Sequence, residues 1–172
     1  LPPAFDPAQQ PAPPAEQWDA LRLEKANRNY ALEYVRNGLC ELAAVVGEAE
    51  ARELGRTAAK LIGLQYFPET AEMVGAVDGG LDDAAAYLVR MFAGMGDTAT
   101  VEGTDEGRVI RHEGLRVVRG LEGRERALVL DCWTELWRGA MHSQRELKSL
   151  TPRHSDADSV WRLEPLTTRA QA

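Results

Sequence analysis

The chain has 172 residues, of which 44% are hydrophobic and 27% are charged. This length suits one domain, and no apolar run reaches the roughly 18–20 residues that a membrane-spanning helix needs. The formal net charge of −7 argues against nucleic-acid binding, because that function depends on a basic surface.

The first residues, LPPAFDPAQQPAPPAE, contain too many prolines for a helix or a central strand. We interpret residues 1–16 as an extended arm that packs along its own domain or along a neighbouring subunit. Residues 17–165 are then the single domain, and residues 166–172 are a polar tail.

Three amphipathic helices are predicted next. The first starts near Trp18 and ends at Gly47, the second is expected to end at Phe67-Pro68 with a short helical segment at 70–76, and the third begins after an Asp-Gly-Gly turn. The residues predicted to face the core are Leu32, Val35, Leu39, Leu42 and Val46 in the first helix, Ala51, Leu54, Ala58 and Leu61 in the second, and Leu81, Ala85, Leu88, Phe92 and Met95 in the third.

After Gly96 the pattern changes to alternating, β-branched residues. Residues 98–103, 108–112 and 115–119 are predicted to form a small antiparallel β-meander with two hairpin turns. A long helix from about Arg124 to Leu147, closed by Thr151-Pro152, and a final strand at 159–164 complete the prediction. The fold class is therefore α+β: N-terminal amphipathic helices, the meander, one long helix and a final strand.

Charge is distributed unevenly along these elements. Residues 69–107 hold nine acidic residues against one basic residue, whereas residues 108–172 hold twelve basic against nine acidic. The acidic stretch is typical of a solvated face, or it could meet the basic half across an interface. The argument against nucleic acid is weakest for the arginine-rich residues 108–119.

Cysteine and histidine usage excludes several chemistries. Cys40 and Cys132 are too few for a disulfide framework, which predicts a cytoplasmic protein. The three histidines have no metal-ligand spacing, and no glycine-rich phosphate loop or nucleophile elbow occurs, so we expect no metal and no cofactor. His112-Glu113 is placed at a hairpin turn, either as a general acid/base pair or as an ordinary exposed turn.

The long helix carries the other candidate catalytic residues. Asp131, Glu135, His142 and Glu146 fall on one flank, beside an apolar face that includes Cys132. If this boundary lines a pocket, Glu135 could act as an acid or base and Cys132 as a nucleophile or gating residue; if it faces water, it is an ordinary polar flank.

Trp133, Trp137 and Trp161 concentrate aromatic surface in a chain with 6% aromatic residues. Together with His142 they are candidate ligand-binding residues, since clustered indoles can line a pocket. The alternative is that the tryptophans simply fill the core.

The order of elements resembles a known family. A GEAEAR helix start at 47–52, AKLIG at 59–63, Gly96-Asp97 before a β-hairpin, and a final strand with Trp161-Arg162-Leu163 look like the L-2-amino-thiazoline-4-carboxylic acid hydrolase-like and 4-vinyl reductase-like proteins. Where we picture Cys-Pro and a strand cysteine in that hydrolase-like group, this chain has Gly120-Leu121 and Val160-Trp161.

Two functions follow as hypotheses. The first is a small-molecule-binding domain, which the resemblance extends to a hydrolase of a small heterocyclic or amide-like substrate, with a pocket between sheet and long helix. The second is a non-catalytic small subunit of a heteromeric enzyme complex that docks through its Pro-rich arm. Both are compatible with a homo-oligomer or a partner subunit, and neither involves a membrane.

Overall fold

The computed structural model describes residues 20–104, 106–156 and 158–166. The α+β class predicted from the sequence is confirmed, whereas the predicted arm at residues 1–16 and all but the first residue of the polar tail lie outside the described residues. The elements are α1 (Ala20–Val46), α2 (Glu48–Val74), α3 (Leu81–Gly94), β1 (Thr98–Thr104), β2 (Gly107–Glu113), the 3-10 helix η2 (Arg116–Val118), α4 (Gly123–Ala140), the 3-10 helix η3 (Met141–Ser143), β3 (Leu147–His154) and β4 (Asp158–Pro165).

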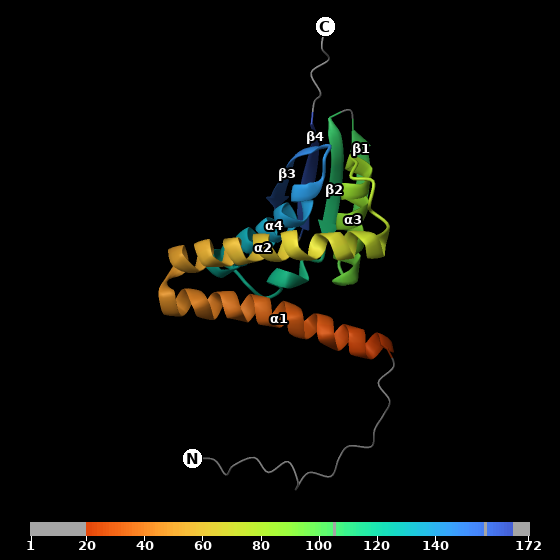
Figure 1. Ribbon diagram of the computed structural model, residues 1–172. Coiled ribbons are helices and arrows are strands. Elements are labelled where there is room, and N and C mark those ends of the chain that lie inside the picture. The colour runs from red at the N-terminus through yellow and green to blue at the C-terminus, as the bar shows by residue number, and fades with distance from the viewer. Residues whose placement is uncertain (1–19, 105, 157, 167–172) are drawn as a thin grey trace, which may run out of the picture.

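Two β-hairpins separated by α4 form one antiparallel sheet with strand order β1-β2-β4-β3. The sheet lies at the top of Figure 1, with α2 below it and α1 farthest away. Alternate residues of the inner strands point into the core, so that Ile110 and His112 of β2 stand beside Trp161 and Ser159 of β4. Helices cover this inner face and leave the other face open.

Helices α2 and α4 pack through glycine. A Cβ atom added at Gly55 would lie 2.7 Å from the sulfur of Cys132, and one added at Gly63 would lie 2.6 Å from the amide nitrogen of Ala140. Small residues therefore allow the two backbones to approach closely. The side of α2 that meets α4 is not the side that the sequence predicted to be buried. The predicted buried residues Leu54, Ala58 and Leu61 are exposed, and of that predicted stripe only Ala51 is buried.

Helix α1 lies on the rest of the fold without burying any residue fully. Leu32 and Leu39 are half-buried against the core, as predicted, but Val35 and Val46 are exposed. The predicted end at Gly47 is confirmed, because this residue has a φ of 94° and turns the chain into α2.

Proline 68 does not end α2, contrary to the prediction. It lies inside the helix, where the Thr70 hydroxyl bonds the carbonyl of Tyr66 at 2.8 Å and the Phe67 ring packs edge-on against Tyr87. Tertiary packing thus stabilises a helix that continues through Pro68, although proline removes one backbone hydrogen-bond donor.

Two further predictions after residue 114 were wrong. Residues 115–119 are not a strand, because the left-handed backbone of Gly114 and Leu115 leads into η2 and buries Val117 and Val118. The long helix ends at Ala140, and Leu147–His154 is a strand that the sequence analysis missed. Pro152 lies in this strand because β3 is at the edge of the sheet, where a missing N–H costs no ladder bond.

Candidate functional site

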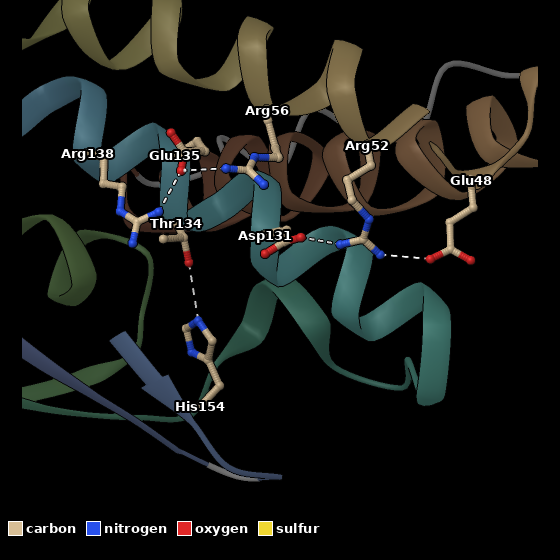
Figure 2. Close-up of polar contacts among 8 residues, drawn as sticks. All are labelled: Glu48, Arg52, Arg56, Asp131, Thr134, Glu135, Arg138 and His154. Carbon is tan, nitrogen blue, oxygen red and sulfur yellow. Dashed lines mark hydrogen bonds and ion pairs between the residues drawn. The ribbon is translucent and has the colours of Figure 1, made fainter. Parts of the chain in front are cut away.

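A seam of ion pairs joins α2 to α4 (Figure 2). Arg52 binds Asp131 and also bonds Glu48 of its own helix at 2.8 Å, while Arg56 approaches Glu135 at 3.3 Å. Both arginines come from α2 and both acids from α4, one turn apart on each helix, so the two helices run parallel with a constant register. The seam lies along the flank on which the sequence placed its acidic candidates.

Glu135 is held by two guanidinium groups. Its side chain is 12% exposed, and it accepts a hydrogen bond from Arg138 at 2.7 Å in addition to the contact with Arg56. A carboxylate that is neutralised on both sides ties the helices together.

Cys132 lies behind this seam and is 3% exposed. Burial, followed by the nearby charge of Asp131, raises the pKa of its thiol to about 11. The nucleophilic form of cysteine is the thiolate, which this environment suppresses at neutral pH. Its contact with Gly55 is a packing contact between helices, and this position does not favour nucleophilic chemistry.

His112 is not at a hairpin turn, as the sequence analysis placed it, but inside β2 with 0% exposure. Its Nε2 lies 3.0 Å from Asp97 Oδ2, and the indole N–H of Trp161 donates to its Nδ1 at 3.3 Å. Because an indole nitrogen can only donate, Nδ1 is the acceptor and the ring proton is on Nε2, facing the carboxylate. Both ring nitrogens are therefore occupied within the core.

The aromatic residues pack against one another around this histidine. Phe92 stacks on the His112 ring with centroids 3.9 Å apart, and Trp137 meets Phe92 and Trp133 edge-on at 5.2 and 5.1 Å. Trp133, Trp137 and Trp161 are all buried core residues. The space between sheet and long helix, where the sequence placed a ligand pocket, holds this cluster.

The remaining candidate, His142, is exposed in η3 and borders a surface hollow of about 330 Å³. The structure thus joins His112 with Trp161 in the core, whereas Glu135 lies in the seam and Cys132 is buried behind it. It does not bring His142 into either group.

Two polar groups were missed by sequence reasoning. The His154 ring lies 3.2 Å from the Thr134 hydroxyl of α4 (Figure 2). Its other ring nitrogen lies 2.5 Å from the Ser159 hydroxyl, and burial lowers the pKa of His154 from the usual value. Asp97, the partner of His112, lies directly after α3 and also accepts the N–H of Arg116. Neither group has a local motif, because Asp97 lies 15 residues from His112 and Thr134 lies 20 residues from His154 in the sequence.

Comparisons with known proteins add no family. No protein-family model matches the chain, and no curated protein sequence matches it. In the part of the chain that the structure describes, no three His, Cys, Asp or Glu side chains are grouped so that they could hold a metal ion. The described helices include none that is long and apolar enough to cross a bilayer.

Proposed function

We propose that the chain is a non-catalytic assembly subunit that binds through the outer side of its α1–α2 hairpin, with a second copy of itself as the first partner. The observation that carries the proposal is the position of apolar surface. Of fifteen large hydrophobic side chains exposed among the described residues, twelve belong to α1 or α2. Apolar surface concentrated in this way is typical of a protein-binding site.

Helix α1 has apolar side chains on two opposite sides. Leu32 and Leu39 pack inward, whereas Tyr30, Tyr34 and Val45 point outward with exposed fractions of 77%, 82% and 81%. The spacing of four and eleven residues places these three on one side of the helix. A helix that already covers its own core with one side has a second side suited to a partner.

Self-association suits the position of the two tyrosines. They flank the midpoint of α1, which spans residues 20–46. A two-fold antiparallel pairing of α1 with its copy would set Tyr30 of one copy against Tyr34 of the other at the centre. Tyrosines at the centre of an interface are among the residues that contribute most to binding.

The contacts of three candidate catalytic groups support a non-catalytic role. The imidazole of His112, the thiol of Cys132 and the carboxylate of Glu135 are each engaged by neighbours within the fold. Hydrolysis of a small heterocyclic or amide-like substrate is the alternative that the family resemblance implies, and none of these contacts favours it.

Sedimentation velocity on the full chain between about 1 and 100 µM tests the proposal. We expect a dimer that Tyr30→Glu with Tyr34→Glu weakens at least tenfold, since two buried carboxylates would oppose association. Val77→Glu, at an exposed apolar residue outside α1 and α2, is the matched control and should leave the dimer unchanged. A monomer at the highest concentration, or a dimer indifferent to the tyrosine changes, would overturn the proposal.

A further inference from the structure

The open face of the sheet carries a cluster of arginines, independent of the proposed assembly surface. Arg111 of β2, Arg153 of β3 and Arg162 of β4 are exposed there, and the half-buried Val109 and Val160 lie between them. These five residues belong to the lining of a shallow hollow of about 650 Å³. We call the side chains of Arg111, Arg153 and Arg162 the arginine triangle.

The strand register fixes the shape of this triangle. Arg111 and Arg153 are both paired with Val160, one from each side, so they lie two strand spacings or about 10 Å apart. Arg162 is two residues further along β4 and is therefore diagonal to both, at roughly 7–8 Å. Long side chains at these spacings can converge on one small anion above the valines.

The arginine triangle has few ion pairs of its own. Arg111 lies 3.3 Å from Glu102, and both side chains are more than half exposed, so this ion pair is weak. Among the residues that the structure describes, Arg153 and Arg162 have no acidic partner. Two free guanidinium groups on a chain of net charge −7 form a local site for a doubly charged anion.

We propose that the arginine triangle binds a small organic phosphate monoester, with its phosphate between the guanidinium groups and its apolar part on Val109 and Val160. A phosphate monoester carries a charge between about −1.5 and −2 at neutral pH, and guanidinium groups bind its oxygens in pairs. The apolar floor adds affinity that inorganic phosphate cannot gain.

The surroundings of the triangle favour a compact ligand over a nucleic acid. The outward positions of the four strands carry no aromatic side chain on which a base could stack. Glu113, Asp158 and Glu164 occupy outward positions towards the strand ends and would repel an extended polyanion. The site therefore suits one phosphate group.

Isothermal titration of the full chain with 1-naphthyl phosphate tests this inference. We expect saturable binding that weakens at least about tenfold in Arg153→Gln with Arg162→Gln, because each lost guanidinium–phosphate contact is charge-assisted. Arg90→Gln with Arg124→Gln removes the same charge from exposed sites on α3 and α4 and should change the affinity less than twofold. Inorganic phosphate and 1-naphthoate should bind more weakly than the monoester.

A variant that binds the monoester more tightly distinguishes an effect on the binding site from damage to the fold. Glu102→Gln frees Arg111 and removes a negative charge, so we expect it to tighten binding several-fold, and added salt should weaken binding. Absence of saturable binding at millimolar ligand, equal loss in the two double variants, or tight binding of a single-stranded oligonucleotide without binding of the monoester would overturn the inference.

Discussion

His112 connects three parts of the core through single side-chain contacts. It receives a hydrogen bond from Trp161 of β4, donates one to Asp97 after α3, and stacks on Phe92 within α3. An imidazole with both nitrogens bonded and one face covered orients its neighbours. At this scale histidine serves as a bifunctional hydrogen-bonding residue, and the buried carboxylate of Asp97 depends on it.

A double-mutant cycle measures this dependence. His112→Ala leaves the Asp97 carboxylate without its main donor, and Asp97→Ala leaves the Nε2 proton without an acceptor. Unfolding free energies are measured in urea. We expect the sum of the losses in the two single variants to exceed the loss in the double variant by about 1–3 kcal/mol. The exposed pair Glu102 and Arg111 is the control, with an expected coupling below about 0.5 kcal/mol. Additive losses at His112 and Asp97 would contradict the pairing.

His154 makes the stability depend on pH. Its pKa is lowered from 6.5 mainly by burial, with the positive charge of Arg126 adding to the effect and the negative charge of Asp131 opposing it. The unfolded chain therefore binds the proton first, so this stabilisation is present above about pH 6.5 and is lost on acidification through the lower folded pKa.

Unfolding free energies measured at pH 7.5 and 5.5 test whether acidification destabilises the protein through His154. The wild type should lose more stability than His154→Asn, with a difference in slope of at most about 1.4 kcal/mol per pH unit. The exposed His142→Asn is the control and should follow the wild type. An equal loss in His154→Asn would show that the proton binds elsewhere.

At the scale of elements, the contact between α2 and α4 depends on glycine. Gly63→Ala would place a methyl group 2.6 Å from a backbone nitrogen of α4, and backbone atoms of a helix cannot move aside alone. We expect a loss of about 2–3 kcal/mol in unfolding free energy. Gly38→Ala, where no atom lies within 4 Å, should instead stabilise α1 by about 0.5–1 kcal/mol. If Gly63→Ala and Gly38→Ala shifted the thermal unfolding temperature in the same direction, this packing would be contradicted.

This contact also explains where prediction from sequence succeeded and failed. Periodicity located all four helices, since amphipathic patterns and glycine ends are local signals. It chose Leu54 and Leu61 as buried because leucine usually is, yet Gly55 and Gly63 face α4 and the leucines face outward. Which side of a helix touches another backbone is set by the partner helix, and no local pattern contains that partner.

The same limit applied to the candidate site. The flank with Asp131 and Glu135 was located from spacing alone, but the arginines that neutralise it are on α2, some 79 residues earlier in the chain. His112 was placed in a turn because His-Glu-Gly has turn composition, whereas its register against Ser159 puts it in the core. Long-range pairing decided the role of each residue.

At the scale of the molecule, three surfaces differ in chemical character. The inner face of the sheet and the helices share one core, the outer side of α1 is left apolar, and the outer face of the sheet is charged. We expected one interior pocket among the tryptophans, and our two proposals concern exterior surfaces instead: the outer side of α1 for protein association and the outer face of the sheet for a small anion.

The strand order has a consequence for how the chain reaches this structure. The last strand, β4, lies between β2 and β3, so β2 receives its second neighbour from residues 158–165 at the end of the described chain. Trp161 and Leu163 enter the core with β4, about fifty residues after the end of the β1–β2 hairpin that β4 joins. A nascent chain can therefore form its helices and its first hairpin early, but the sheet closes only after β4 has been synthesised, and this long-range pairing is expected to slow folding.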